Sequence, residues 1–481
     1  MREHRTIFSN HTATDAKASE QRDTMIRVIL DRCRKFFSLK EIYLRELRNR
    51  WGRRHNIYRD RSDIARLYSL TQDHKAGKSV DDSTWNDLDM DALFDRLDNN
   101  TTPIGRQYLY RQLRTYEPDE ATLQLQYQVS THFKSDQTLR ETVQLNMWLL
   151  RSSNASSITG MLFGEIPEGD FPNWQAWCLA SISLASIITA LVMPALFWLP
   201  IVPVIANFIF AEAHSHKIGS HSLSFVYLRN LLIVASRLSA IVFDSDIGQL
   251  EELKNNRQKI KQLCVYFRIV GLDSTSENPL VANIAYLLNL VCLLDFLIFM
   301  RCSKRLAVHK GELSDIYLAV ASIDSAISVG SYMEMIGDHC CPVFGNPNTM
   351  HFEAVTHPLL EVAVPNDYSS AALSALITGS NMAGKSTFIK TIGTNLIMAQ
   401  SIWICHARSA LVPKAPVMSS IKRSDSLKEG KSYYFAEIEA LLRLIIASYE
   451  EQPYVFLIDE ILHGTNTVER IASAAAILDR I

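Results

Sequence analysis

A glycine-rich segment near residue 380 carries the residue types that hold a phosphate. It fits the pattern G-x-x-x-x-G-K-[ST], in which the glycines let backbone N–H groups turn toward phosphate oxygens. Lys385 would reach the β- and γ-phosphates and Ser386 would ligate Mg²⁺, so the pattern predicts a nucleotide site; the alternative is a glycine-rich turn. The predicted site comprises Gly379, Ser380, Asn381, Met382, Ala383, Gly384, Lys385, Ser386 and Thr387.

Two adjacent carboxylates, Asp459 and Glu460, follow the apolar run YVFLI. The carboxyl ends of strands in α/β sheets are where ligands bind. Asp459 would hold Mg²⁺, often through water, and Glu460 would polarise the attacking water. A strand ending in solvated acids is the alternative, but the position downstream of the glycine-rich segment favours a catalytic pair.

A polar turn lies between these motifs, in the sequence DSLKEGKSYYFAE of residues 425–437. Gly430 and Ser432 precede a predicted helix, and a helix N-terminus with a small hydroxyl residue suits a phosphate. Since the glycine-rich segment already serves the chain's own nucleotide, we expect Gly430 and Ser432 to contact a nucleotide held by another subunit. The alternative is an ordinary capped helix start.

The elements that must position these motifs differ from those before them. After Cys340, apolar runs such as AALSALIT and YVFLID alternate with amphipathic helices, which is typical of a parallel sheet in an α/β domain. We expect a strand over residues 375–378 and a helix over residues 387–400. As far as about residue 335, apolar residues recur three and four apart, which predicts helices.

The longest uncharged stretch covers residues 177–211, 35 positions without Asp, Glu, Lys or Arg. A membrane helix needs about 20 apolar residues, and this stretch is interrupted by three prolines. We therefore expect a membrane hairpin at about 175–213, with two short spans joined by PALFWLP and Trp174, Trp177 and Trp198 at the interfaces. The alternative is an unusually apolar core hairpin.

A third apolar stretch, residues 280–300, contains Asn283, Asn289 and Asp295. A carboxylate in the middle of a membrane is expensive. We expect a soluble core helix here.

A basic segment over residues 31–61 carries eleven Lys and Arg against four Asp and Glu, a local charge of +7. Tyr43, Leu47 and Trp51 recur at helical spacing, so we expect an amphipathic basic helix on anionic lipid or phosphate backbones. The alternative is a solvated arm packed by its apolar stripe. Positive charge favours the cytoplasmic side, so both flanks of the hairpin are expected there.

The whole chain is close to neutral, with 49 Lys and Arg against 51 Asp and Glu among 481 residues. Global charge therefore predicts no polyanion partner. The eight cysteines form no Cys-x-x-Cys pair, which fits a reducing compartment better than a disulfide framework or a structural zinc site. The polar N-terminus predicts no cleaved secretory signal.

Three segments together resemble the ATPase domain of the MutS family, the DNA mismatch-repair clamps. They are GSNMAGKST at residues 379–387, DSLKEGKSYYFAE at 425–437 and DEILHGTNTVER at 459–470. CPVF at 341–344, THPLLE at 356–361 and VPND at 364–367 match the family's entry into that domain. TPIG at 102–105 resembles the start of its helical core, so the resemblance begins at about residue 88.

The resemblance implies an α + α/β protein. A polar N-terminus and basic arm (1–80) would precede a helical MutS-like core and lever domain (81–335) with the inserted hairpin, followed by a P-loop NTPase domain (336–481) with a parallel sheet. It also implies ATP and Mg²⁺ as cofactors and a homodimer in which Ser432 of one subunit completes the site of the other. Nucleotide state would move helical levers that embrace DNA.

Several positions depart from the family pattern. No N-terminal mismatch-reading domain and no Phe-x-Glu wedge precede the core, Ala363 replaces an aromatic residue beside the adenine, and His463 replaces an Arg. Ile481 lies only 21 residues beyond Glu460, so the sheet is expected to be incomplete and the chain to be either a fragment or compromised in hydrolysis.

We therefore expect an ATP-binding, ATP-hydrolysing MutS-like protein tethered to a membrane, which binds DNA with little sequence specificity. The alternative is a non-catalytic nucleotide-binding membrane scaffold. A transporter ATPase is disfavoured, because LKEGKS stands where such proteins carry an LSGGQ-like signature.

Overall fold

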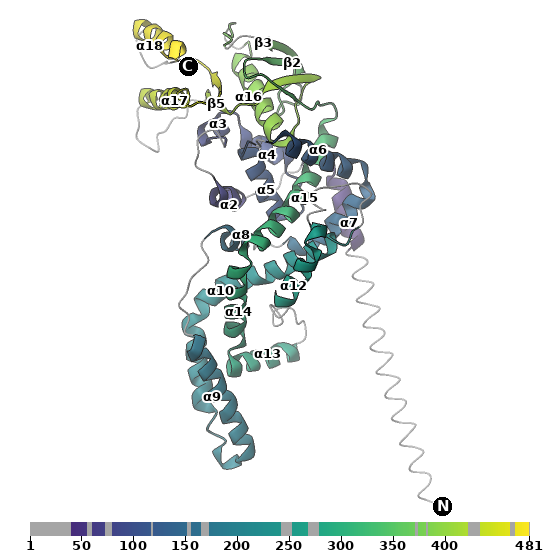
Figure 1. Cartoon of the computed structure of the whole chain (residues 1–481), viewed down its shortest axis with the longest axis vertical. Coiled ribbons are helices and arrows are strands. Elements are labelled where there is room, and N and C mark those ends of the chain that lie inside the picture. Colours follow the sequence, from purple (N-terminus) through teal and green to yellow (C-terminus); the bar gives the residue numbers. More distant parts are fainter. Residues whose placement is uncertain are drawn as a thin grey trace, which may run out of the picture. The chain divides into compact units, whose positions relative to one another are not determined.

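The elements of the chain are seen in a computed structural model (Figure 1). It describes residues 40–54, 60–72, 79–116, 119–151, 155–164, 173–241, 253–267, 279–370, 374–380, 383–421, 433–461 and 467–480. The chain divides into two compact units, Met1–Arg53 and Arg54–Ile481.

The first unit contains a helix over residues 40–50, so part of the expected basic helix is confirmed. Arg50 and Glu46, one turn apart on this helix, form an ion pair with an N–O distance of 3.9 Å. The parts of the basic segment at residues 31–39 and 55–59 lie outside the described residues.

The second unit is built around a long helix, α15 (Lys310–Ile336). By length and composition α15 could cross a membrane, but 94% of its apolar window is buried inside the protein. α4 (Met90–Leu97), α5 (Pro103–Arg114), α6 (Glu120–Ser135) and α8 (Ala155–Phe163) pack against it. α15 is therefore the core helix of the helical part.

The start of α5 is fixed by a buried carboxylate of α15. Asp324 accepts hydrogen bonds from the backbone N–H of Thr101 (3.0 Å) and from the backbone N–H and hydroxyl of Thr102 (2.8 and 2.7 Å). Burial raises the pKa of the Asp324 carboxyl, and the bonds from Thr102 and Thr101 oppose that rise. A Cβ on Gly105 would lie 2.3 Å from the Asp324 carboxylate, so glycine is required there. This contact explains the TPIG sequence at residues 102–105.

Five further described helices belong to the helical part, apart from α9, α10, α13 and α14. They are α2 (Arg61–Thr71), α3 (Asp82–Asp87), α7 (Gln137–Met147), the short helix η1 (Trp148–Leu150) and α12 (Arg257–Phe267).

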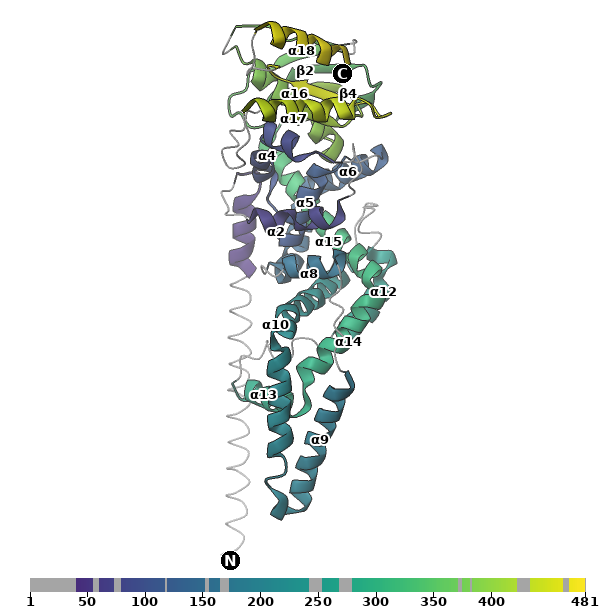
Figure 2. The ribbon, with the colours of Figure 1, turned by 90° about the vertical axis from the view of Figure 1, so that its left-hand side faces the viewer.

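The uncharged stretch forms a helical hairpin. α9 (Asn173–Val192) runs to a turn that contains η2 (Pro194–Leu196), and α10 (Ile201–Leu238) returns beside α9 (Figure 2). Only 22% of the apolar window Trp174–Val192 is buried, in contrast to α15.

The apolar stretch at residues 280–300 is two helices, so the expectation of one core helix was wrong. α13 (Pro279–Cys292) and α14 (Leu294–Val308) are separated at Leu293, whose backbone is left-handed (φ 51°). The amide of Asn289 donates to the Asp295 carboxylate (2.5 Å) and its carbonyl accepts from the backbone N–H of Asp295 (3.0 Å). This bonding satisfies the first turn of α14 from outside the helix, and left-handed Leu293 separates α14 from α13.

The described residues of the C-terminal part form two small sheets rather than one parallel sheet. The first has the order β1-β4-β2-β3, with β1 (Val343–Gly345) parallel to β4 (Ser409–Pro413) and β2 (Met350–Val355) antiparallel to both β4 and β3 (Asn366–Ser370). The second pairs β5 (Val417–Ser420) in parallel with β6 (Val455–Ile458). The parallel expectation therefore holds for β1–β4 and β5–β6 only, since β2 and β3 form a hairpin that adds an antiparallel edge.

Three helices accompany these sheets: α16 (Lys385–Ile402), α17 (Tyr433–Ala447) and α18 (Thr467–Arg480). One apolar core joins the C-terminal part to the helical part, because it includes Leu88 and Leu113 from the N-terminal side together with Leu396 and Leu457. α16 lies between the two, with contacts to α5, α6, β5 and β6.

Candidate functional site

The glycine-rich segment leads directly into α16, which begins at Lys385. Gly384 stands immediately before the helix with a left-handed backbone (φ 86°), a conformation that other L-residues rarely adopt. The expected helix after the segment is thereby confirmed, and it starts two residues earlier than predicted. Asn381 and Met382 lie outside the described residues.

The side chain of Lys385 lies over its own loop. Its ammonium donates to the backbone carbonyl oxygens of Gly379 (2.7 Å) and Ser380 (3.0 Å). The backbone N–H of Ala383 also donates to the Ser380 carbonyl (3.2 Å), which closes the turn before the helix. Ser386 and Thr387 are exposed in the first turn of α16. One ammonium, two exposed hydroxyls and the N–H groups of a helix N-terminus therefore occur together at the start of α16.

The strand expected over residues 375–378 is not formed. The described residues 374–380 take no part in either sheet, and Leu376 is 87% exposed. An apolar run becomes a strand only where a neighbouring edge supplies hydrogen bonds and a packed face, and residues 375–378 pair with neither sheet.

The two carboxylates follow β6 as expected. β6 ends at Ile458, and the backbone N–H of Asp459 donates to the carbonyl of Ser420 (3.0 Å), which extends the pairing with β5 by one residue. Glu460 has a left-handed backbone (φ 52°), and its side chain is exposed. Such a conformation costs energy in a non-glycine residue, so the chain turns sharply away from the sheet here.

The helix with the glycine-rich segment packs closely on the strand with the carboxylates. At Gly393 of α16, a Cβ would lie 2.4 Å from Cδ1 of Leu457 in β6 and 3.0 Å from the Leu88 methyl groups. Only glycine allows this approach. Lys385 and Asp459 are thus carried by two elements in direct contact, and the ammonium of Lys385 is bonded to its own loop and not to Asp459.

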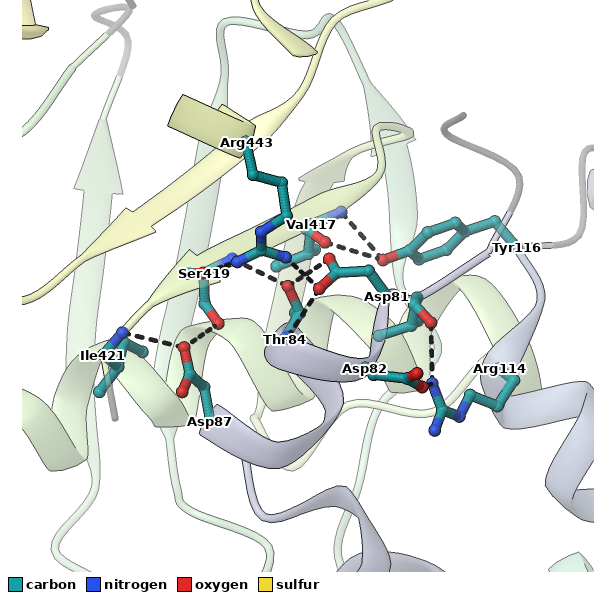
Figure 3. A network of polar contacts seen from close by, with 11 residues as sticks. Asp81, Asp82, Thr84, Asp87, Arg114, Tyr116, Val417, Ser419, Ile421 and Arg443 are labelled. Carbon is teal, nitrogen blue, oxygen red and sulfur yellow. Dashed lines mark hydrogen bonds and ion pairs between the residues drawn. The ribbon is translucent and has the colours of Figure 1, made fainter. Parts of the chain in front are cut away.

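Gly430 and Ser432 lie outside the described residues, but the elements on either side of them are described. β5 leads into that segment and α17 follows it. Asp87 of α3 accepts from the hydroxyl of Ser419 (2.7 Å) and from the backbone N–H of Ile421 (2.9 Å), at the point where the chain leaves β5 (Figure 3).

Side chains from the helical part and from α17 bond further backbone groups along this edge of β5 (Figure 3). The hydroxyl of Thr84 accepts from the backbone N–H of Ser419 (2.9 Å), and that of Tyr116 accepts from the N–H of Val417 (2.9 Å). Arg443 of α17 forms an ion pair with Asp81 and donates to the carbonyl of Ser419 (2.5 Å). The edge of the two-stranded sheet is therefore closed by α3, Tyr116 and α17.

Sequence reasoning did not find this edge cluster. The only local signal is the N-cap of α3, where Asp81 accepts from the backbone N–H of Thr84 (3.0 Å). That signal predicts a helix start, but it says nothing of Arg443 or Ser419, more than 300 positions away.

His357, from the THPLLE segment, is buried, and its Nδ1 accepts from the backbone N–H of Leu359 (3.2 Å). Burial lowers the pKa of His357, and Lys390 adds to this. Lys390 itself pairs with Asp89 (2.7 Å) and so ties α16 to the start of α4. These contacts indicate that His357 supports the structure around α16.

The donor set fits a phosphate and a hard cation. Lys385 and the first turn of α16 present positive charge and N–H groups, and Ser386 presents a hydroxyl of the type that ligates Mg²⁺ in P-loops. Among the described residues, no group of three or more His, Cys, Asp or Glu could hold a metal ion by itself. A cation bound here would therefore depend on phosphate oxygens as well as on Ser386 and Asp459.

Comparison with known protein families finds a match in the C-terminal part of the chain. Residues 375–481 match MutS domain V. This range contains the glycine-rich segment, α16, both carboxylates and the segment with Gly430 and Ser432, so the MutS domain V region includes every residue of the predicted site.

Curated relatives extend the similarity upstream of the MutS domain V region. The chain is 28% identical over 195 residues to the DNA mismatch repair protein MutS 2 of Halobacterium salinarum, covering 39% of this chain and 22% of the relative. It is 28% identical over 198 residues to MutS of Granulibacter bethesdensis (39% and 21%), and 32% identical over 171 residues to MutS of Thermus aquaticus (35% and 19%). These matches relate the chain to the MutS family, and they span about a fifth of each relative's length.

Proposed function

We propose that the chain is an ATP-binding and ATP-hydrolysing protein of the MutS type, which works as a dimer and is held on a membrane. One observation carries the nucleotide part of this proposal. The glycine-rich segment enters α16 through left-handed Gly384, within the region that matches MutS domain V.

Each site residue has a role that follows from its chemistry. Lys385 exchanges the carbonyl oxygens of Gly379 and Ser380 for phosphate oxygens, which are stronger acceptors because they are charged. Ser386 and Asp459 would hold Mg²⁺, which neutralises phosphate charge when bound. Glu460, beyond the end of β6, would orient and polarise the attacking water. Gly430 and Ser432 would reach the nucleotide held by the other subunit of the dimer.

The rate of ATP hydrolysis by the Glu460→Gln variant tests the proposed catalytic role of Glu460. The amide keeps the shape of the side chain and removes the base, so we expect ATP binding to persist and turnover to fall by roughly 100-fold or more. Glu451→Gln, an exposed change before β6, is the matched control and should leave turnover unchanged. Equal turnover in the wild type and Glu460→Gln would contradict the role of Glu460. ATP binding by the wild type without any turnover would instead support a non-catalytic nucleotide-binding scaffold.

The membrane part of the proposal rests on the inverted polarity of the hairpin. Asn207 of α10 is fully buried, and its amide donates to the hydroxyl of Ser183 in α9 (2.8 Å) and to the carbonyls of Leu290 and Val291 in α13 (3.1 and 2.8 Å). Large apolar side chains point outward instead, among them Ile182, Leu184, Ile188, Ile205, Phe208 and Ile209. Polar residues inside and apolar residues outside suit a lipid environment.

Washing of isolated membranes distinguishes insertion of the hairpin from electrostatic binding of the basic arm to the membrane surface. A hairpin in lipid should keep the full chain in the membrane fraction through high salt and alkaline carbonate, because acyl-chain contacts are not screened by salt. Association through the basic arm alone would be released by salt. Full recovery in the soluble fraction without detergent would contradict membrane attachment.

A further inference from the structure

The turn between α9 and α10 is apolar throughout. The 17 residues between Thr189 and Asn207 include no polar side chain except the indole of Trp198. Three of the most exposed side chains in this part are Leu191 (78%), Phe197 (74%) and Val202 (67%). A turn that emerged on the far side of a membrane would hold these apolar side chains in water, which is unfavourable.

Most backbone N–H groups of the turn do not need hydrogen bonds from water. Backbone N–H groups of Leu196, Phe197, Leu199 and Ile201 donate to carbonyls three residues earlier, at 2.9 to 3.3 Å. Pro194 and Pro200 have no N–H group to satisfy. Non-helical backbone is tolerated in hydrocarbon only when its polar groups are bonded within the protein, and this turn largely meets that condition.

Two carboxylates mark the level at which the hairpin leaves water. Ala176 of α9 packs with Leu293 and Phe296, and Phe210 and Ala211 of α10 pack against the same cluster. Exposed Glu212 follows Ala211, and exposed Asp295 lies beside Phe296. Since ionised carboxylates avoid hydrocarbon, this cluster lies at or outside the membrane boundary.

Beyond this cluster, both helices of the hairpin are shorter than the thickness of the hydrocarbon core. From Leu179, which packs against the cluster, to Val192 at the end of α9 is 14 residues, or about 21 Å of helix. On α10, Ile201 to Ala211 is 11 residues, or about 16 Å. The hydrocarbon core of a bilayer is about 30 Å thick.

We infer that the hairpin enters one leaflet and turns back inside the hydrocarbon, so that its partner is the acyl chains of a single leaflet and it does not cross the bilayer. This inference rests on the membrane attachment proposed above. It replaces the two short spans expected from the sequence by one re-entrant wedge. Exposed Arg301 and Lys304 of α14, just beyond the cluster, would then meet the headgroups of the same leaflet.

Maleimide labelling of the full chain in sealed vesicles tests the inference. The variant Phe197→Cys is incorporated into phosphatidylcholine–phosphatidylglycerol vesicles and exposed to a membrane-impermeant maleimide, either added outside or trapped in the lumen. Labelling is read by mass spectrometry on the peptide that contains position 197, so other cysteines do not interfere. Ala195→Cys is a second variant of the turn, and exposed Glu361→Cys is the water-facing control.

A re-entrant hairpin predicts that positions 195 and 197 resist both reagents and react at least tenfold faster after detergent, while position 361 reacts without detergent. Labelling of position 197 by lumenal reagent alone would show that the hairpin crosses, and would overturn the inference while leaving membrane attachment intact. Labelling from outside, with the chain in the soluble fraction, would overturn both.

Discussion

Lys385 is the residue on which the proposed phosphate site depends most. Its ammonium has three donors, and two of them are directed at carbonyl oxygens of its own loop, 2.7 and 3.0 Å away. The loop is thus folded around the cation, and a phosphate oxygen would compete with neutral acceptors only. We therefore expect the ammonium of Lys385 to contribute most of the free energy of phosphate binding.

His406 is a buried histidine from which we predict a pH dependence of stability. It is buried, its Nε2 lies 2.7 Å from the hydroxyl of Tyr332, and its backbone N–H donates to Asn395 of α16 (2.7 Å). Burial, together with the charges of Arg96, His339 and His357, lowers the pKa of His406 to about 4.

The sign of the effect follows from proton counting. An unfolded chain holds this histidine near its ordinary pKa of about 6.5, so between pH 6.5 and 4 the unfolded state binds more protons. The free energy of unfolding should therefore fall as the pH falls through this range, with a contribution of about 3 kcal/mol from His406. Urea unfolding at several pH values should show a flatter profile for His406→Gln than for the wild type. His351→Gln, an exposed change in β2, should keep the wild-type profile, and parallel profiles for all three proteins would contradict the prediction.

The contact between α16 and β6 depends on Gly393. Adding a methyl group there would bring it within 2.4 Å of Leu457, so we expect Gly393→Ala to lower the free energy of unfolding by about 1–3 kcal/mol. Gly311→Ala is the matched control, because nothing lies within 4 Å of its Cβ position in α15 and alanine favours helices by about 1 kcal/mol. Chemical denaturation of both variants measures the difference. Equal stability of the two variants would show that α16 and β6 are not packed this closely.

The elements were predictable where a local pattern decides them. The helix after the glycine-rich segment, the strand before Asp459 and the hairpin of the uncharged stretch follow from glycine, apolar runs and proline. The failures have two causes. Residues 280–300 are divided locally at left-handed Leu293, beside the bond between Asn289 and Asp295. Residues 375–378 are apolar and strand-like, but they pair with neither sheet, because pairing depends on partners that are distant in sequence. The edge of β5 is closed by Thr84, Asp87 and Tyr116, which local sequence cannot pair with it.

For the whole chain, neutrality and the family similarity give different expectations about DNA. With 49 basic and 51 acidic residues, binding must come from local patches, and contacts to phosphate carry little sequence information. We expect weak, steeply salt-dependent binding without preference for mismatched duplex, largely lost when Arg48, Arg50, Arg53 and Arg54 become Ala. Anionic vesicles should displace DNA from the same arm.

A matched control removes four charges elsewhere, at Lys254, Arg257, Lys259 and Lys261. This control should retain DNA binding and its salt dependence in a titration over several salt concentrations. A clear mismatch preference at physiological salt would contradict the expectation. Binding that survives both the four-Arg change and the vesicles would place the DNA site in the helical part instead.

The proposed function depends above all on whether residues 379–387 hold ATP. Equilibrium binding of ATP·Mg²⁺ to the full chain, by calorimetry, measures this directly for the wild type, Lys385→Ala and the control Lys259→Ala, an exposed lysine of α12. Because Lys385 supplies the one mobile positive charge of the glycine-rich segment, its loss should weaken binding by roughly 100-fold or more, as expected for a charge-assisted contact. Lys259→Ala should bind like the wild type. Unchanged affinity in Lys385→Ala would contradict the assignment of residues 379–387 as a nucleotide site.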